Sequence, residues 1–429
     1  MSNIHALINR TPSTKDIKLV DCKWPDDALH FIPDWVYTSN AVYDLEIEKI
    51  FRGPTWNYVA LEAEIPNAGD YKRSYVGATA VVVSRAEDGS ISVFENRCAH
   101  RGAEFCRHSQ GNTKEFVCPY HQWSYDLKGN LQGVPFKRGV NRQGGMPKDF
   151  RNEDHGLYKL HVTTCNGVVF ASYSAEVEPL AEYLTPEILK DFDTVFNGKR
   201  LKILGYYKNE LPFNWKMYHE NLKDPYHATL LHSFLVVFGL LVAGNKSAMI
   251  ADPVHGRHGT MASAKSEEKY ASVSDENKKE MRSFREDMQL RDDRFLDFIK
   301  EFDSPWSVTM QTIWPNLIVQ REMNTLGVRH LVPNGPDSML MLWTMFGYED
   351  DTEEMTRHRL RQGNLMGPAG FLGLEDNEAM KFVQEGVRRS STDRNLLKLD
   401  HDHVGTSNSL ISESAIRAMY RYYRNVMGF

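Results

Sequence analysis

The stretch that most constrains this chain runs from Cys98 to His121, where two thiols and two imidazoles occur in interleaved pairs. It reads C-x-H and then, after residues 101–117, C-x-x-H. Two Cys thiolates on one iron and two His imidazoles on the other are the ligands of an iron–sulfur centre with mixed ligation. The spacing therefore predicts a [2Fe–2S] cluster held by Cys98, His100, Cys118 and His121.

A structural zinc ion is the main alternative for these four residues. Zinc fingers usually group two Cys before two His, whereas the pairs alternate here, which favours iron–sulfur chemistry. The other three cysteines, Cys22, Cys106 and Cys165, show no partner pattern and are expected to be buried or surface thiols. Unpaired cysteines suit a reducing compartment, so we expect a cytoplasmic protein.

The motif resembles that of the Rieske family, and within it the oxygenase branch. The electron-transport branch carries an extra Cys in each loop, where this chain has Ala103 and Tyr120. The resemblance therefore implies a cluster without the disulfide of that branch.

Length and charge narrow the class of protein. The chain has 429 residues, 41% of them hydrophobic and 25% charged, which is enough for two or more domains with hydrophobic cores. A net charge of −6 disfavours nucleic acid and anionic membranes as partners. The longest apolar run, residues 234–244, is too short to span a bilayer, and residues 1–16 lack the apolar core of a signal peptide.

Short strand patterns separated by turns dominate residues 55–173. Strands are expected at residues 58–61, 75–83, 91–94, 123–127, 160–164 and 168–172. Asp88-Gly89 and Asn166-Gly167 are pairs typical of tight hairpins. We therefore predict a small all-β domain over residues 55–173 whose loops carry the cluster. Residues 1–54, with a helical pattern near their end, are predicted to pack against the catalytic domain.

The composition changes after residue 173, where helical and strand patterns alternate. Helices are expected over residues 175–196, from 215, over 265–302, from a capping box at Asp351 and Glu354, and over 376–388 and 411–427. Strands are expected at residues 201–207, 310–314, 317–319, 327–331 and 339–348. This pattern predicts an α+β fold, with residues 174–429 as a catalytic domain. The family resemblance implies an antiparallel sheet covered by helices, of the helix-grip type.

A second candidate metal site lies in the segment NWKMYHENLKDPYHATLLH. It places Asp224, His227 and His232 close together, and two imidazoles with one carboxylate on one face are the ligands of a non-haem iron oxygenase. His227 and His232 are about 140° apart around an ideal helix, so we expect an irregular turn there, initiated by Pro225. On its own, a pair of ordinary histidines is the simpler interpretation.

The same segment resembles the iron motif of the large subunit of aromatic-ring-hydroxylating dioxygenases, in the pattern E-N-x-x-D-x-Y-H-x4-H. The resemblance implies that His227 and His232 bind iron and that Asp224 links the iron site to the cluster of a neighbouring subunit. Downstream, GPAGFLGLEDNEAM resembles the closing segment of the family, which makes Asp376 the third ligand. Glu375 and Glu378 remain alternatives, and a carboxylate in the first turn of a helix is the simpler interpretation of Asp376.

No G-x-G-x-x-G follows a predicted strand, so the chain is not expected to bind a dinucleotide. The resemblance implies electrons from an NAD(P)H-dependent reductase through a ferredoxin. It also implies a homotrimer of large subunits in which one subunit's cluster serves the next subunit's iron, with a small beta subunit completing an α3β3 assembly.

Substrate contacts are the least constrained part of the sequence. Six apolar residues are available to line a pocket, although for most of them a place in the core is the simpler interpretation: Phe234, Val236, Val237, Phe238, Leu240 and Leu241. Arg329 suits a carboxylate because of its guanidinium fork, although a structural ion pair accounts for it equally well. Gln320 and Asn221 are further polar candidates.

The sequence is most similar to oxygenases of aromatic acids, namely salicylate 5-hydroxylase, anthranilate dioxygenase and terephthalate dioxygenase. We therefore expect hydroxylation of salicylate to gentisate, with cis-dihydroxylation of anthranilate, terephthalate or another benzoate as the alternative. A Rieske electron-transfer protein without oxygenase activity is the alternative of another class.

Overall fold

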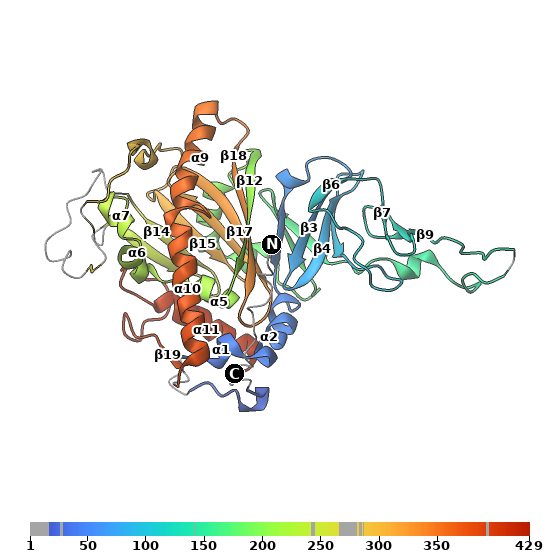
Figure 1. Cartoon of the computed structure of the whole chain (residues 1–429), viewed down its shortest axis with the longest axis horizontal. Helices are drawn as coiled ribbons and strands as arrows, with labels where there is room; N and C mark the ends of the chain where they lie inside the picture. Colours follow the sequence, from blue (N-terminus) through green and yellow to red (C-terminus); the bar gives the residue numbers. More distant parts are fainter. Residues whose placement is uncertain are drawn as a thin grey trace, which may run out of the picture.

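The computed structural model describes residues 17–25, 29–141, 143–241, 245–265, 281, 282, 285, 287–391 and 394–429. Figure 1 shows an elongated molecule in which a large body of helices over an antiparallel sheet carries a projecting unit built from short strands. The predicted α+β fold, a small all-β part beside a larger helix-covered sheet, is confirmed.

The projecting unit contains three small antiparallel sheets, with strand orders β5-β4-β3-β6, β7-β8-β9 and β10-β11-β2. Their strands are β2 (Asn57–Leu61), β3 (Asp70–Val76), β4 (Thr79–Arg85), β5 (Ile91–Glu95), β6 (Gln110–Asn112), β7 (Phe116–Val117), β8 (Ser124–Tyr125), β9 (Leu131–Gly133), β10 (His161–Cys165) and β11 (Val168–Ser172). Asn166 and Gly167 both have positive φ and join β10 to β11, so the hairpin predicted there is confirmed.

The larger body is built on a seven-stranded antiparallel sheet of order β12-β18-β17-β16-β15-β14-β13. Its strands are β12 (Leu201–Leu211), β13 (Ser247–Ala251), β14 (Gly259–Ser263), β15 (Val308–Ile313), β16 (Leu317–Glu322), β17 (Thr325–Pro333) and β18 (Met339–Tyr348). Side chains alternate between its two faces. One face packs on α3 (Leu180–Leu184), α4 (Pro186–Val195) and the strands β2 and β11, and the other faces the site described below.

Helices cover the second face of the sheet. They are α1 (Trp35–Thr38), α2 (Asn40–Glu46), α5 (Trp215–Asn221), α6 (Pro225–Leu231), α7 (Ser233–Val237), α9 (Glu353–Met366), α10 (Phe371–Arg389) and α11 (Ser414–Met427). The described N-terminal residues share a hydrophobic core with this layer: Trp24 packs on Tyr420 and Phe51 on Trp215. A two-stranded sheet of β1 (Phe31–Pro33) and β19 (Arg394–Leu396) adds to this contact. The described residues between 17 and 54 therefore pack with the larger body. We propose residues 55–173 and 174–429 as the two domains.

Several predicted helices differ from the structure. The helix expected over residues 175–196 is two short helices, α3 and α4, and the helical region from residue 215 is divided into α5, α6 and α7. Of the helix expected over residues 265–302, the described part contains only a short 3₁₀ turn, Asp293–Leu296, and the remainder lies outside the described residues. The capping box expected at Asp351 is wrong, because Thr352 caps α9 and accepts a hydrogen bond from the Met355 N–H. Asp351 is engaged in tertiary contacts instead.

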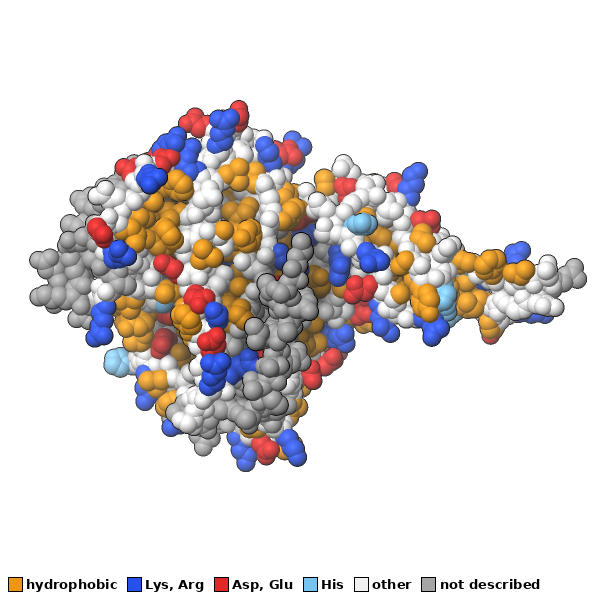
Figure 2. Space-filling model, in the orientation of Figure 1, with side chains coloured by type: hydrophobic (Ala, Val, Ile, Leu, Met, Phe, Trp, Pro, Cys, Tyr) orange, Lys and Arg blue, Asp and Glu red, His pale blue; other side chains and the backbone are white. Residues whose placement is uncertain are grey.

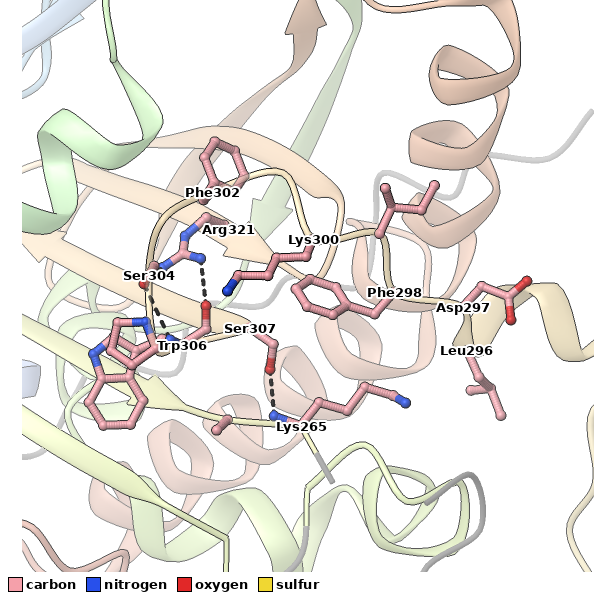
Figure 3. A pocket seen from close by; sticks show the side chains of 13 residues that line it. Lys265, Leu296, Asp297, Phe298, Lys300, Phe302, Ser304, Trp306, Ser307 and Arg321 are labelled. Atoms are coloured by element: carbon pink, nitrogen blue, oxygen red, sulfur yellow. Dashed lines mark hydrogen bonds between the residues drawn. The ribbon is translucent and has the colours of Figure 1, made fainter. Parts of the chain in front are cut away.

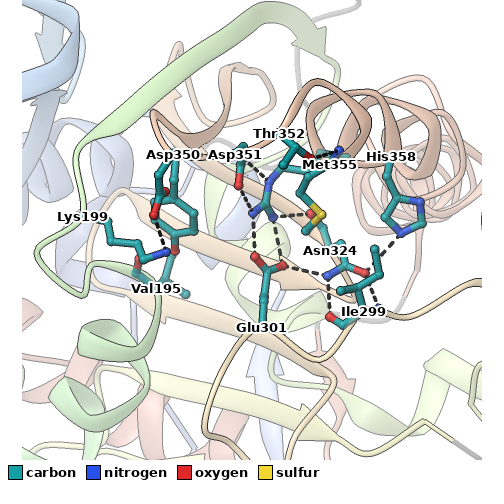
Figure 4. A network of polar contacts seen from close by, with 12 residues as sticks. Val195, Lys199, Ile299, Glu301, Asn324, Asp350, Asp351, Thr352, Met355 and His358 are labelled. Carbon is teal, nitrogen blue, oxygen red and sulfur yellow. Dashed lines mark hydrogen bonds and ion pairs between the residues drawn. The ribbon is translucent and has the colours of Figure 1, made fainter.

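Those contacts centre on Arg359, a buried side chain of α9. Figure 4 shows three of its partners, Asp351, Glu301 and Asn324. Its guanidinium donates to Asp351 at 2.7 and 2.9 Å, to Glu301 at 3.0 and 2.6 Å, and to the carbonyl of Asn324 at 2.8 Å. One cation thereby ties α9 to the segment before β15 and to the turn between β16 and β17. The network holds α9 on the rim of the sheet.

Replacing Arg359 with alanine should lower the free energy of unfolding by about 3–5 kcal/mol, because two largely buried carboxylates lose their counterion. Denaturant unfolding of the purified protein measures the change. Arg357→Ala is the matched control, since its ion pair with Glu353 on the same helix is exposed and should contribute at most about 1 kcal/mol. Equal effects of the two substitutions would contradict the prediction.

Candidate metal centres and active-site cavity

Two loops of the projecting unit bring the predicted cluster residues together, and both close with the same hydrogen bonds. In the first, the Cys98 N–H donates to the Ala103 carbonyl and the Gly102 N–H donates to the Cys98 carbonyl, each at 2.9 Å. In the second, Cys118 bonds in the same way to Trp123 at 2.8 Å and to Gln122 at 2.9 Å. Gly102 and Gln122 occupy equivalent left-handed positions, with φ of 74° and 58°. The two loops are therefore local turns that each present one Cys and one His.

The two cysteines of these loops are buried, and the two histidines are not. Cys98 and Cys118 are 3% and 1% exposed, whereas His100 and His121 lie at the surface with ring centroids 4.5 Å apart. The Tyr125 hydroxyl lies 3.2 Å from the Cys98 sulfur, and the His100 ring stacks on Trp123. The order of the residues, one Cys and one His from each loop, fits a two-iron cluster better than a single zinc.

The second candidate site is built on a broken helical segment. Instead of one long helix, the chain forms α5, α6 and α7 in succession, and Asp224 caps α6 by accepting from the Tyr226 N–H at 3.0 Å. Pro225 is the first residue of α6. His227 lies in the first turn of α6, and His232 lies in the break between α6 and α7. This break supplies the irregular turn that the five-residue spacing requires, so both imidazoles face the same point.

Asp376 approaches these two imidazoles from α10. Its Oδ1 lies 3.0 Å from His232 Nε2 and 3.4 Å from His227 Nε2. Ligand atoms about 2.1 Å from a metal and at right angles to one another are about 3 Å apart, and the two distances from Asp376 are close to that spacing. Among the described residues, this is the one group of three His, Cys, Asp or Glu side chains with ligand atoms within 4.8 Å of one another. Asp376 lies in the second turn of α10, so the simpler interpretation, a carboxylate in the first turn, is wrong.

The outer nitrogens of both imidazoles face carboxylates. His232 Nδ1 lies 2.7 Å from Glu375 Oε2, and His227 Nδ1 lies 3.4 Å from Asp224 Oδ2. Carboxylates in this position orient metal-binding histidines and raise their basicity. Burial would lower the pKa of His227, but Asp224 and Asp376 outweigh it and raise that pKa to about 10. The group thus concentrates negative charge around two imidazoles, as a site for a cation does.

The third ligand candidate is itself strongly polarised by its neighbours. Burial would raise the pKa of Asp376, but the imidazoles of His232 and His227 hold it far below its usual range. Asn221 also donates to Asp376 Oδ1, at 3.1 Å. The residue remains an anion at neutral pH, which suits a metal ligand.

A narrow, largely apolar cavity of about 40 Å³ begins at this group. Its walls are aliphatic or methionine side chains together with two polar residues, Ser263 and Glu322. The apolar lining residues are Leu222, Ala228, Leu235, Leu240, Leu241, Met261, Val308, Met310, Met323, Met366, Leu372 and Leu410. A metal bound by His227, His232 and Asp376 would therefore face a pocket suited to an apolar ring.

The structure places the predicted substrate contacts at different depths. Asn221 lies among the candidate ligands, 3.3 Å from His227 Nε2. Arg329 and Gln320 do not line the cavity. Arg329 is fully buried, donates to the Tyr218 hydroxyl at 2.7 Å and stacks over Trp343. All three remain predictions as substrate contacts.

Most of the cavity was not foreseen from the sequence. Of the six apolar residues named from the sequence, Leu240 and Leu241 line it, and the two phenylalanines and two valines are buried around it. Leu235, which was not named, also lines it. Glu322 was missed, although a charged residue inside a buried strand pattern is a signal that could have indicated it.

A second, more open hollow of about 760 Å³ lies beside the β14 and β15 ends and is lined by Lys265, Lys300, Trp306 and Arg321, among others (Figure 3). Arg321 is engaged there with the Trp306 carbonyl at 2.7 Å and the Ser304 hydroxyl at 3.1 Å. None of the candidate metal ligands lines this hollow. It is therefore separate from the active-site cavity.

Two family models match the chain. Residues 55–143 match the Rieske [2Fe-2S] domain, and residues 199–428 match the ring hydroxylating alpha subunit (catalytic domain). None of the helices in the described ranges combines the length and hydrophobicity that a bilayer-spanning segment needs.

Similar proteins cover nearly the full length. The large oxygenase component of salicylate 5-hydroxylase from Ralstonia sp. is 47% identical over 95% of this chain and 97% of its own. The large subunit of anthranilate 1,2-dioxygenase from Burkholderia cepacia is 44% identical over 95% of this chain and 96% of its own. Among solved structures, naphthalene 1,2-dioxygenase from Rhodococcus sp. shares the fold with a TM-score of 0.74, 23% identity and coverage of 92% of this chain and 94% of that one.

Proposed function

We propose, from the premise that this chain belongs to the ring-hydroxylating oxygenases as an alpha subunit, that it hydroxylates an aromatic carboxylate. Membership makes it the large subunit of a Rieske-type oxygenase that uses a [2Fe–2S] cluster and a mononuclear iron. The substrate that we propose is salicylate, hydroxylated to gentisate, and cis-dihydroxylation of anthranilate, terephthalate or another benzoate is the alternative. The observation that carries the proposal is a set of three metal-ligating side chains at the end of an apolar cavity.

We assign the cluster to Cys98, His100, Cys118 and His121, and the iron to His227, His232 and Asp376. Ferrous iron held by these residues would supply the chemistry that activates dioxygen. The chain's own residues exclude water with the aliphatic wall of the cavity and orient the imidazoles through Glu375 and Asp224.

Electron supply follows from where the two centres lie. Figure 1 shows β7 and β9 toward one end of the molecule and α6 and α7 at the other. A cluster and an iron so placed in one chain do not face each other, which supports transfer from the cluster of a neighbouring subunit. We propose a trimer of large subunits, with a small beta subunit and a ferredoxin and NAD(P)H reductase as donors.

The projecting end has a surface suited to such contacts. Tyr120 beside His121 is 60% exposed, and Phe136 and Val140 are 75% and 55% exposed. Figure 2 shows hydrophobic side chains gathered along this end. An apolar surface next to the surface imidazoles supports docking of this end against another protein.

The cavity must widen to admit a ring. A cavity that binds benzene measures about 150 Å³, whereas this one is about 40 Å³. Four lining residues, Met261, Met310, Met323 and Met366, are methionines, whose unbranched side chains change rotamer readily. We propose that these methionines move aside when the substrate enters.

Reconstitution with a reductase and a ferredoxin tests the proposed function. Salicylate, anthranilate, terephthalate and benzoate should be screened for coupled oxygen uptake, with the products identified by mass spectrometry. We expect coupled uptake with at least one of them, and gentisate from salicylate. Cluster reduction without oxygen incorporation into any aromatic acid would instead favour an electron-transfer protein.

A further inference from the structure

Glu322 is the unexpected polar group of the cavity. Apart from the candidate iron ligands, it shares the lining only with Ser263 and apolar side chains, and it is 3% exposed. No lysine or arginine lines the cavity among the described residues. A carboxylate in an apolar wall is costly unless it has partners, so its presence calls for one.

Hydrogen bonds within β16 hold Glu322 in place. The Gln320 amide, two residues earlier on the same face, donates to Glu322 Oε2. The same amide nitrogen donates to the Met366 carbonyl at 2.9 Å, which anchors it to the end of α9. The carboxylate is therefore a positioned acceptor on the sheet, whereas the candidate iron ligands reach the cavity from the helices.

Ser263 lies level with Glu322 on the same face of the sheet. In the strand register Ser263 pairs with Val308, and Val308 pairs with Glu322. Neighbouring strands are about 4.8 Å apart, so a hydroxyl and a carboxylate flank one valine across about 10 Å of sheet. A ring that lies over Val308 would therefore have the Ser263 hydroxyl as a donor on one side and the Glu322 carboxylate as an acceptor on the other, within reach of two adjacent substituents.

We infer that Glu322 determines substrate specificity by accepting a hydrogen bond from a hydroxyl or amino group ortho to the carboxylate of the substrate, while Ser263 donates to that carboxylate. The assignment deepens the function proposed above, on which it rests. The reverse orientation would bring two carboxylates together in an apolar cavity, where like charges repel strongly. A ring without the ortho donor would remove water from the Glu322 carboxylate without replacing the lost hydrogen bond, so it should bind more weakly.

The charge state of Glu322 agrees with an acceptor. Burial raises the pKa of Glu322 to about 7, against the opposing effects of Arg329 and Gln320. At pH 8 the side chain is therefore mostly ionised, and the test belongs at that pH.

The test compares Glu322→Met and Glu322→Gln with the wild-type holoenzyme. Salicylate, anthranilate and benzoate are each measured for kcat, KM and, by calorimetry on the oxidised enzyme, Kd. In Glu322→Met we expect KM and Kd for salicylate and anthranilate to rise about 10- to 100-fold, whereas those for benzoate should stay the same or fall, because benzoate no longer removes water from an unpaired carboxylate. In Glu322→Gln, which keeps a neutral acceptor, the rise should be smaller. Glu354→Met, at an exposed position of α9, is the matched control.

The outcomes separate the two levels of proposal. Wild-type enzyme that neither binds nor oxidises any of these three acids or terephthalate would overturn the proposed function. Wild-type enzyme that binds them, together with variants whose ratio of Kd values for salicylate and benzoate is unchanged, would overturn the role of Glu322 alone. If Glu322→Met loses the visible spectrum of the cluster through misfolding, Glu322→Gln decides by the same ratio.

Discussion

Asp376→Ala protein should retain its [2Fe–2S] cluster but lose its mononuclear iron, and oxygen uptake with it. Asp376 Oδ1 lies 3.0 Å from His232 Nε2 and 3.4 Å from His227 Nε2. Without that oxygen, two neutral imidazoles remain, and iron affinity should fall by more than about 100-fold, since even outer partners of a ligand are worth about 10- to 100-fold. Iron and sulfide analysis measures both centres in one sample, and the visible spectrum reports the cluster separately.

Two neighbouring glutamates are the controls for Asp376, because the sequence offered both as alternative ligands. Glu378 is on the exposed side of α10, where it bonds to Lys381, so Glu378→Ala should keep both iron and activity. Glu375→Gln should weaken iron binding less than Asp376→Ala, because Glu375 contacts only the outer nitrogen of His232. Full iron content and wild-type turnover in Asp376→Ala would show that another residue is the ligand.

Asp224→Asn should reduce turnover by about 100-fold while both metals stay bound. Asp224 does not belong to the group of three candidate ligands, and its Oδ2 faces the outer nitrogen of His227 at 3.4 Å. This contact is longer than the 2.7 Å between Glu375 and His232, so its loss should affect iron binding less than the loss of Glu375 does. Asparagine is as good a helix cap as aspartate, so α6 should still begin at Pro225 and hold His227 in place. The substitution removes the carboxylate that would accept hydrogen bonds both from His227 and from the cluster ligand His121 of a neighbouring subunit.

Rapid mixing of the prereduced enzyme with oxygen and substrate measures that step directly, as the rate at which the cluster is reoxidised. We expect the rate to collapse in Asp224→Asn while metal content stays at the wild-type level. Asp292→Asn is the matched control, because Asp292 caps the 3₁₀ turn Asp293–Leu296 in the same manner. Reoxidation and turnover at wild-type rates would refute the bridging role of Asp224.

The cluster loops were predictable because they are local. Cys98 bonds to Ala103 and Gly102, and Cys118 to Trp123 and Gln122, so each loop closes within six residues of chain. The number, type and spacing of the ligands were therefore sufficient to predict the chemistry before any tertiary contact was known. The hairpin at Asn166-Gly167 was predictable for the same reason.

The helices of the larger body were less predictable, since packing decides where they begin and end. The pattern near Asp351 suggested a cap, but Arg359 recruits that carboxylate and Thr352 caps α9 instead. Likewise, the helical region after Trp215 is broken into three short helices, and the break at His232 is what turns two imidazoles toward one point.

The kinds of candidate ligand, their local spacing, the class of fold and the family could all be recognised in short segments of the chain. The approach of Asp376 on α10 to His227 and His232 could not, nor could the cavity wall of methionines and one glutamate from β14, β15, β16 and α9. These contacts join side chains far apart in the chain, and their geometry depends on how helices pack on the sheet rather than on any local pattern.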